Sequence, residues 1–451
     1  MAPSAVASTE ACIENIELHN ETLNAVVTWD ADAALASATE ADRAASEGRW
    51  LGLLHGMTMT LKDNIATAGM RTTSGAKFFA DHVPNEDAEV VRRLRGAGAV
   101  LIGKANMQEL AFGVVTTNPV FGQCRNPWNP EHIPGGTSGG SGASVAAGMC
   151  QGSLGTDTGG SVRIPAAMTG VVGLRPTHGR ISIRGVTPAS MSNDTIGPMA
   201  REVTDVARLF AALSGYDVHD PVSADQPLAN FLPSLSDGIA GKRIGIARKF
   251  HFQRVHPTVE EAVLDAVRVF ERLGAEIREI DLPGAELAQD WNIAQIYGDI
   301  CAHFKERLVN DPESISPRVR ARMMLGLDFT AVDYAEAMRG KEIWQRTLKR
   351  IFEEEVDMIL APTVPITPPP ITGDENLHEA TRDAARFTYG SALSSHPGLS
   401  VPCGFTSDGL PIGLMLEATW WNEPLLFRAG VAYQSVTDWH TRRPPLLGAS
   451  H

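Results

Sequence analysis

The chain has 451 residues, 43% of them hydrophobic and 20% charged, and its formal net charge is −14. This length and composition are typical of a folded protein that buries a large core, and no low-complexity linker divides the chain. Because phosphate binding relies on clustered lysine and arginine side chains, the acidic balance argues against nucleic acid as a direct ligand.

The first third of the chain predicts alternating strands and helices. The alanine-rich stretch from Ala31 to Glu47 favours a solvent-facing helix. The alternating segment MTMTLKDNI, from Met57, predicts a strand that carries Lys62 at its end. A helix over 88–98 and a strand over 99–107 follow. This order of strand, helix and strand indicates an α/β fold.

The same alternation continues in the second half. RIGIARKF, from Arg243, predicts a strand, and the next segment predicts a helix in which Thr258 and Glu261 form a capping box. Helical patterns fill 287–352, a buried strand then leads into a proline-rich loop, and a hairpin is expected around 407–409. We expect one domain over 1–451, with an N-terminal helical segment over 1–50 and a helical substrate-pocket insertion over about 285–355.

The cysteines and histidines give no sign of a metal site. The 5 cysteines are far apart and never spaced CxxC, which favours neither a disulfide framework nor a zinc site, and the 13 histidines show no ligand spacing. The first residues, MAPSAVASTEAC, do not resemble a signal peptide, and no apolar run approaches about 18 residues. We therefore expect a cytoplasmic protein without membrane contact.

Two clusters of glycine and hydroxyl residues stand out: PGGTSGGSGAS from Pro134 and GTDTGGSVRIP from Gly155. Glycines let the backbone approach a ligand, and consecutive N–H groups before a helix hold an anion or a developing oxyanion. Ser161 lies where the helix after the second cluster is expected to start. One such cluster is usually a tight turn, but two of them favour a catalytic site.

Other catalytic motifs do not fit these clusters. A phosphate loop requires GxxxxGK before Ser or Thr, which is absent, and an α/β-hydrolase elbow requires GxSxG where the chain has GGSGA. The string SGAK, from Ser74, matches the SxxK of penicillin-binding enzymes, but the KTG motif of those enzymes is missing and we interpret the match as coincidence.

The chain resembles the amidase signature family. The segments that carry this resemblance are MTLKDNI, GKANMQELAFG, NPWNPEHIPGGTSGGSGASVAAG, GTDTGGSVRIPAA, DTIGPMAREVTD, MILAPTVP and LSVPCGFTSDGLPIG, which span nearly the whole sequence. The resemblance implies a single α/β/α domain around a large mixed sheet and a triad of serine, cis-serine and lysine. It implies that Lys62 is the base and Ser161 the nucleophile.

The bridging position departs from the family pattern. The family usually has GGSSGGS and places the bridging serine, after a cis peptide bond, at the first hydroxyl of the pair. Here that position is Thr137, 24 residues before Ser161, and Ser138 corresponds to the second serine, which leaves it as the alternative bridge. Threonine keeps a hydroxyl that both accepts and donates a proton, although its methyl group needs room.

A mechanism follows from this triad. A serine hydroxyl needs a base, and a lysine serves only if burial lowers its pKa and leaves it neutral. The N–H groups of Thr158, Gly159, Gly160 and Ser161 are expected to hold the oxyanion. Neither a metal nor an organic cofactor is required. Asp157 and Arg163, which flank these residues, are expected to pair and stiffen the loop.

Three functions remain as hypotheses: a free-standing amidase, the glutaminase subunit of a tRNA-dependent amidotransferase, and an inactive binding relative. An inactive relative has no need of Lys62 and Ser161. The glutaminase subunits carry a DGVRYG-like segment, and QIYGDICAHFKERL, from Gln295, shows nothing similar.

The free-standing amidase is therefore preferred, as a monomer or homodimer. The resemblance leaves open whether it acts on small amides, anilides, esters or carbamates, including urethanes.

Overall fold

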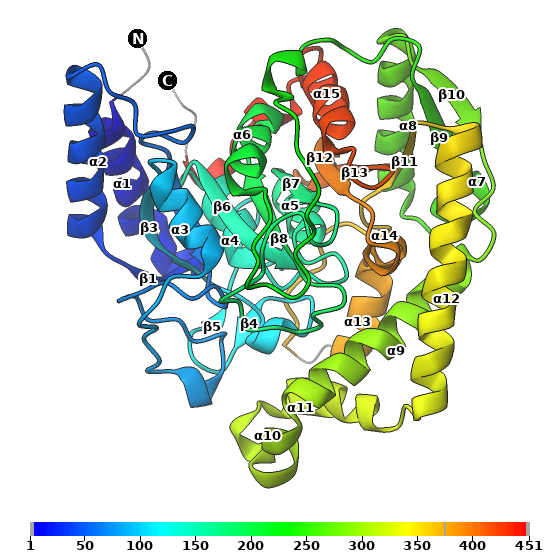
Figure 1. Cartoon of the computed structure of the whole chain (residues 1–451), viewed down its shortest axis with the longest axis horizontal. Coiled ribbons are helices and arrows are strands. Elements are labelled where there is room, and N and C mark those ends of the chain that lie inside the picture. The colour runs from blue at the N-terminus through cyan, green and yellow to red at the C-terminus, as the bar shows by residue number, and fades with distance from the viewer. Residues whose placement is uncertain (1–3, 374–375, 448–451) are drawn as a thin grey trace.

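An 11-stranded mixed sheet forms the centre of the protein in the computed structural model, which describes residues 4–373 and 376–447 (Figure 1). In spatial order its strands are β1 (Val26–Trp29), β3 (Val100–Ala105), β2 (Thr58–Lys62), β6 (Gly152–Asp157), β8 (Thr195–Ala200), β7 (Val172–Arg175), β12 (Gly398–Phe405), β13 (Pro411–Ala418), β11 (Met358–Pro362), β9 (Arg243–Ile246) and β10 (Glu276–Glu279). A separate ribbon pairs β4 (Thr117–Asn118) with β5 (Gly122–Gln123).

Helices cover both faces of this sheet. The first face packs against α3 (Glu89–Gly96), α6 (Val203–Leu213), α8 (Pro257–Arg272) and α15 (Glu423–Gln434). The second packs against α1 (Ala5–Leu23), α2 (Ala31–Ser46), α4 (Gly139–Ala146), α5 (Arg163–Thr169), α9 (Ala285–His303), α12 (Ala331–Arg350) and α14 (Thr388–Ser394). The other α-helices of the described residues are α7 (Arg248–His251), α10 (Lys305–Asn310), α11 (Pro317–Met324) and α13 (Leu377–Ala384). The predicted α/β/α architecture around a large mixed sheet is confirmed.

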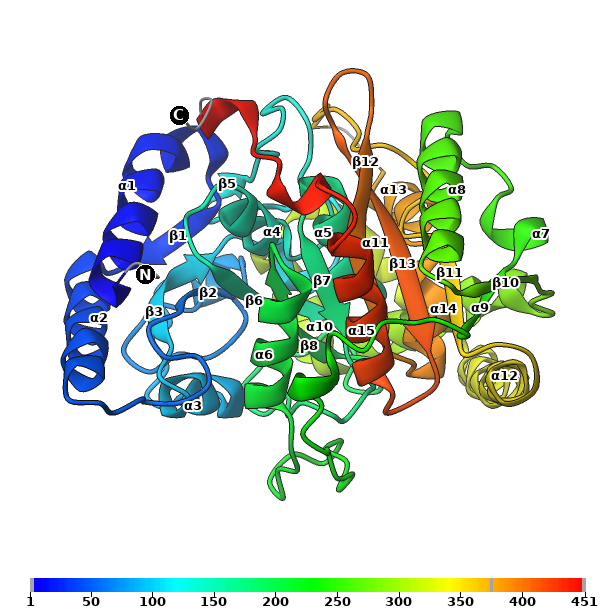
Figure 2. The same cartoon turned by 90° about the horizontal axis from the view of Figure 1, so that it is seen from above.

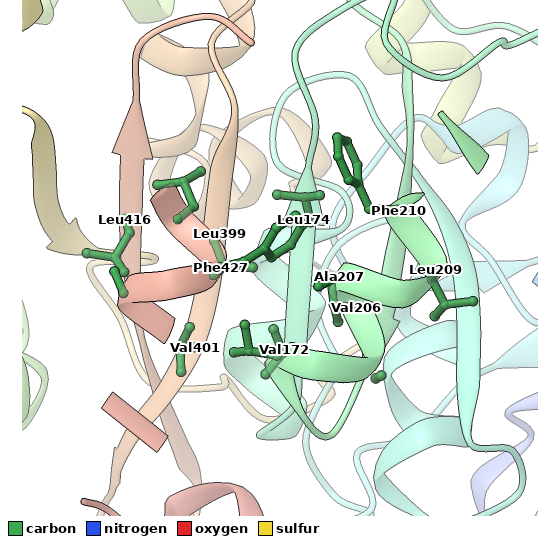
Figure 3. Close-up of a cluster of buried hydrophobic side chains, with 14 of the residues drawn as sticks. Val172, Leu174, Val206, Ala207, Leu209, Phe210, Leu399, Val401, Leu416 and Phe427 are labelled. Carbon is green, nitrogen blue, oxygen red and sulfur yellow. The ribbon is translucent and has the colours of Figure 1, made fainter. Parts of the chain in front are cut away.

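Side-chain alternation along the strands explains the two apolar faces. In β11, Met358 and Leu360 face the helices of the first face, and Ile359 between them packs on the second. On the first face, Leu174 and Leu399 of neighbouring strands meet Phe210 and Phe427 of α6 and α15 (Figure 3). The two phenylalanine rings are 5.3 Å apart. This core holds the central strands rigidly, and the candidate site lies at their ends.

Most of the predicted elements agree with the structure, including α2, β2, α3, β3 and the hairpin β12–β13. The expected capping box of α8 is wrong. The helix begins earlier, at Pro257, because proline suits the first helical position, and the side chain of His256 caps it. The N-terminal segment is not only helical, since β1 joins the sheet edge antiparallel to β3.

Helices α9 and α12 lie at the opposite end of the molecule from α1 and α2 (Figures 1 and 2). No helix in the described ranges is long and apolar enough to cross a membrane. All five cysteines are free and buried.

Candidate active site

The central sheet brings the two catalytic motifs together. Strands β2 and β6 are adjacent and parallel, so their carboxyl ends meet at the same edge. Lys62 is the last residue of β2 and Asp157 the last of β6, and the chain then turns through 158–161 into α5. Residues almost 100 positions apart therefore lie side by side.

Lys62 is completely buried and bonded to two hydroxyl groups. Its Nζ lies 2.6 Å from Oγ1 of Thr137 and 2.7 Å from Oγ1 of Thr156. Burial lowers the pKa of Lys62 to about 7, even though the nearby carboxylates of Asp194 and Asp157 raise it. A substantial neutral fraction of this lysine therefore exists at neutral pH.

The two candidate bridging hydroxyls have different partners. Thr137 contacts Lys62, whereas the hydroxyl of Ser138 donates to the carbonyl oxygen of Thr156 at 3.2 Å and accepts its N–H at 3.3 Å. The geometry thus ties Ser138 to the backbone of β6 and leaves Thr137 facing the lysine.

The cis peptide bond implied by the family resemblance is absent from the described residues. Left-handed glycines turn the chain here instead, since Gly135 and Gly136 have φ of 81° and 63°. A Cβ on Gly136 would lie 2.5 Å from Cδ of Pro165 and 3.3 Å from the carbonyl oxygen of Ser161. The bare glycine therefore lets the segment of Thr137 pack against the backbone of Ser161.

Ser161 is partly exposed and lines a narrow pocket with a free volume of about 30 Å³, roughly that of one water molecule. The other lining residues are Ala111, Phe112, Gly113, Thr158, Gly159, Ile164, Ala189, Ile296, Arg322, Thr381, Ala385 and Tyr389. The hydroxyls of Ser161 and Thr137 are not hydrogen-bonded to each other in this structure. A substrate must displace side chains to enter.

One of the four expected oxyanion donors is already engaged. The N–H of Gly160 donates to Oδ1 of Asp157 at 2.8 Å, because this carboxylate gathers the N–H groups of the turn. In this structure the N–H of Gly160 is therefore not free for an oxyanion, and the assignment of the oxyanion donors stays a prediction. The N–H groups of Thr158, Gly159 and Ser161 remain as candidates. The hydroxyl of Thr388 donates to the carbonyl oxygen of Gly159 at 2.6 Å and fixes the turn.

Asp157 and Arg163 form the expected pair, deep below the pocket. The Arg163 guanidinium donates to the two oxygens of Asp157 at 3.0 and 3.1 Å, and Arg175 adds a third contact at 3.1 Å. Burial raises the pKa of Asp157, but the two guanidinium groups outweigh it and hold the pKa below its ordinary value. Both Asp157 and Arg163 are fully buried, which fits a structural role.

The carboxylate of Asp194 acts on the candidate base, because its charge raises the pKa of Lys62. Its carboxylate accepts the hydroxyl of Thr158 at 2.5 Å and the N–H groups of Ala189 and Ser190 at 2.9 and 3.0 Å. Burial raises the pKa of Asp194 to about 6. Nothing in the segment DTIGPMAREVTD shows that its first aspartate acts on Lys62, so the sequence gives no sign of this interaction.

Sequence reasoning missed Arg322, which reaches the pocket from α11. Its Nε donates to the Tyr297 hydroxyl at 2.7 Å, and its guanidinium carbon lies 3.9 Å from the ring centre of Phe112. Arg322 is only 5% exposed and forms no ion pair with a carboxylate of the described ranges. It also lines an outer hollow of about 320 Å³, which makes it the boundary between the two spaces.

No group of three or more histidine, cysteine or acidic side chains gathers into a possible metal site within 4–373 and 376–447.

Comparisons with known proteins agree with this geometry. The Amidase family model matches residues 7–427. A glutamyl-tRNA(Gln) amidotransferase subunit from Roseiflexus sp. (strain RS-1) is 41% identical, over 98% of this chain and 95% of its own. The protein of the same name from Chloroflexus aurantiacus (strain ATCC 29366 / DSM 635 / J-10-fl) is 40% identical, over 98% and 96%.

Solved structures are also similar. A protein from a vestigial complex, which reveals the evolutionary origins of an s-triazine catabolic enzyme, is 32% identical with a TM-score of 0.90, over 96% of this chain and 95% of its own. A bacterial aryl acylamidase is 26% identical with a TM-score of 0.87, over 100% and 96%. The corresponding amidotransferase subunit of Thermotoga maritima is 29% identical with a TM-score of 0.82, over 96% and 92%.

Proposed function

The chain belongs to the amidase family of C–N bond hydrolases, and on this premise we propose that it cleaves a small amide through an acyl-enzyme on Ser161. The observation that carries the proposal is the 2.6 Å contact between the buried Nζ of Lys62 and Oγ1 of Thr137. A lysine with a pKa of about 7, beside a pocket lined by a serine, is suited to general-base catalysis.

The proposed cycle begins when the hydroxyl of Thr137 passes its proton to neutral Lys62 and takes the proton of Ser161. Oγ of Ser161 attacks the carbonyl carbon, and N–H groups of the 158–161 turn hold the oxyanion. When the C–N bond breaks, the same relay returns the proton to the leaving nitrogen. Water then gives a proton to the relay and attacks the acyl-enzyme, which releases the carboxylic acid and restores Ser161.

The pocket supports a substrate that carries a carboxylate. Arg322 is a buried guanidinium without a carboxylate partner among the described residues, and such a group is a strong receptor for a planar anion. Arg322 lines both the inner pocket and the outer hollow, so on this proposal the carboxylate binds at Arg322 and the amide reaches Ser161 by displacing the side chains that narrow the inner pocket.

Between the two active hypotheses, we therefore favour glutaminase chemistry of the kind carried out in a tRNA-dependent amidotransferase. The relatives named as glutamyl-tRNA(Gln) amidotransferase subunits are 40% and 41% identical over 98% of the chain, and glutamine carries both an amide and a carboxylate. The net charge of −14 limits the proposal to amide hydrolysis and leaves tRNA contact to other chains. This choice reverses the preference drawn from the missing DGVRYG-like segment.

A free-standing amidase for anilides or carbamates is the second candidate. It is supported by the similarity to an aryl acylamidase, at 26% identity and a TM-score of 0.87. On this hypothesis the substrate is neutral and makes no use of the charge of Arg322.

One set of assays separates the candidates. Ammonia release from glutamine and aniline release from a chromogenic anilide are measured for the wild type and for Arg322→Met. We expect glutamine to be preferred, with a KM that rises at least tenfold in the variant. A preference for the anilide, with a KM that Arg322→Met leaves unchanged, would favour the second candidate. Ser161→Ala must abolish both activities, and a phosphonate label found on another residue would refute the nucleophile.

A further inference from the structure

A second pocket lies outside the catalytic site, beyond the ends of β9 and β10. These two strands form one edge of the sheet (Figure 1). The free volume of the pocket is about 560 Å³, which is within the usual range for small-molecule sites. The two strands are parallel, and Ala247 and Ile280, the residues directly after them, line the pocket. In α/β proteins, ligands bind in the crevice beyond the carboxyl ends of parallel strands.

Two arginines in this pocket lack carboxylate partners. Arg254 and Arg386 both line it, and neither forms an ion pair among the described residues. Burial lowers the pKa of Arg386, and the positive charge of Arg254 lowers it further, while the exposed carboxylate of Asp383 opposes this effect. Juxtaposed guanidinium groups repel each other until an anion lies between them, and they bind carboxylate and phosphate through paired hydrogen bonds.

The other lining cations are already neutralised. Lys249 pairs with Asp281 at 2.9 Å, and Arg382 pairs with Asp290 at 2.7 Å. Two carboxylates also line the pocket: Asp281, which is paired with Lys249, and Glu286, which forms no ion pair among the described residues and opposes an anion there.

The start of α9 adds a second attraction for an anion. Ala285 and Glu286, the first two residues of this 19-residue helix, line the pocket. The N–H of Ala285 already donates to the carbonyl oxygen of Leu282, but the cap residue Gly284 has no side chain to accept the N–H of Glu286. The amino end of a long helix carries partial positive charge. Together with the arginine pair, it indicates a ligand with two negative charges.

One wall is shared with the catalytic pocket. Thr381 and Ala385 line the catalytic pocket, whereas Arg382 and Arg386, each one residue further along the same segment, line the second pocket. Two residues after Arg386, Thr388 holds the turn of the nucleophile through Gly159. A ligand that draws Arg386 toward it therefore acts on a segment that supports Ser161.

We propose that this second pocket binds a small organic dianion between Arg254 and Arg386, and that binding changes the reactivity of Ser161. The chemistry common to its ligands is a pair of negative charges on one small molecule, either two carboxylates or one phosphate. The site lies outside the residues that carry the proposed hydrolysis.

Calorimetry with succinate and with inorganic phosphate, at constant ionic strength, tests the binding. Arg254→Gln/Arg386→Gln should weaken it at least tenfold. Arg268→Gln, which replaces an exposed and ion-paired arginine of α8, should leave the affinity for both probes unchanged. Glu286→Gln should increase this affinity. The tighter of the two probes identifies the ligand as a carboxylate or a phosphate. Absence of binding by both probes, or equal binding by the double variant, would overturn the site. Arg254→Gln alone, at an exposed position, provides the same test if the double variant fails to fold.

The coupling is measured by the rate at which a phosphonate labels Ser161, which does not depend on knowing the substrate. We expect the better probe to change this rate at least twofold in the wild type and to leave it unchanged in the double variant. An equal rate with and without a bound probe would refute the coupling, while the calorimetric result would still decide the site.

Discussion

The variant Thr137→Val removes the proposed proton relay and keeps the shape of the side chain. Valine keeps the branched shape and removes only the hydroxyl that stands 2.6 Å from Nζ of Lys62. Lys62 retains its contact with Thr156 at 2.7 Å, so the base stays in place while its route to Ser161 is cut. A positioned proton-transfer group contributes about 10²–10⁴ in rate, and we expect acylation to slow by this factor.

Two neighbouring variants serve as controls. Thr137→Ser keeps the hydroxyl and should stay active. Ser138→Ala deletes two hydrogen bonds to the backbone of Thr156, at 3.2 and 3.3 Å, and each contributes about 1 kcal/mol. We therefore expect Ser138→Ala to lower the free energy of unfolding by roughly 2 kcal/mol and to change acylation little.

Single-turnover kinetics on a chromogenic amide measure acylation without interference from product release, and urea denaturation measures stability. The variant that slows acylation more identifies which of the two hydroxyls is the bridge. A Thr137→Val enzyme that acylates at the wild-type rate, beside a Ser138→Ala enzyme that does not, would place the bridge at Ser138.

Three further predictions concern the charges of the site. First, kcat/KM should rise with pH through about 7 as Lys62 loses its proton, and Asp194→Asn should move this limb to lower pH, because the carboxylate of Asp194 stabilises the ammonium form; a limb that stays in place or moves upward would contradict the assignment. Second, Lys62→Met should abolish activity but raise the melting temperature at pH 7, and calorimetry that finds a lower value would show that burial of the lysine is not costly. Third, Asp157→Asn leaves Arg163 and Arg175 buried without a carboxylate and should cost about 3–5 kcal/mol in urea denaturation, as is typical of a broken buried ion pair; a loss below about 1 kcal/mol would show that the pair is dispensable.

The parts of the site that depend on local sequence were predictable. Lys62 was expected at a strand end because its segment alternates, and Ser161 was expected before a helix because glycines and hydroxyls precede it. Both of these inferences use only residues within one segment, where propensity and turn chemistry act directly. The role of Thr137, by contrast, came from the resemblance to the family pattern, which places a bridging hydroxyl 24 residues before Ser161.

The remaining parts depend on long-range contacts. Arg322 is 161 residues beyond Ser161 and enters the pocket only because α11 packs beside α9. Nothing in RVRARMM distinguishes this arginine from its neighbours. The hydrogen bond from the N–H of Gly160 to Asp157 likewise depends on where the carboxylate lies in the fold, which the sequence does not show. Strand β1 was missed because four residues carry too little periodicity to indicate an edge strand.

The catalytic base and the stability of the fold oppose each other. Lys62 has an ordinary pKa of 10.5 when unfolded and about 7 in the folded protein, and each pKa unit corresponds to about 1.4 kcal/mol. Folding at pH 7 therefore costs roughly 4 kcal/mol at this residue, and the cost disappears as the pH rises from about 7 to 10.5, because only the unfolded chain holds the proton in that range. Methionine would remove this cost but leave Thr137 and Thr156 without their nitrogen partner, at about 1 kcal/mol each, so a net gain of about 2 kcal/mol is expected. The surrounding hydrogen bonds thus offset only half of the destabilisation, and the neutral lysine is retained at the expense of stability because a charged one cannot accept the proton of Ser161.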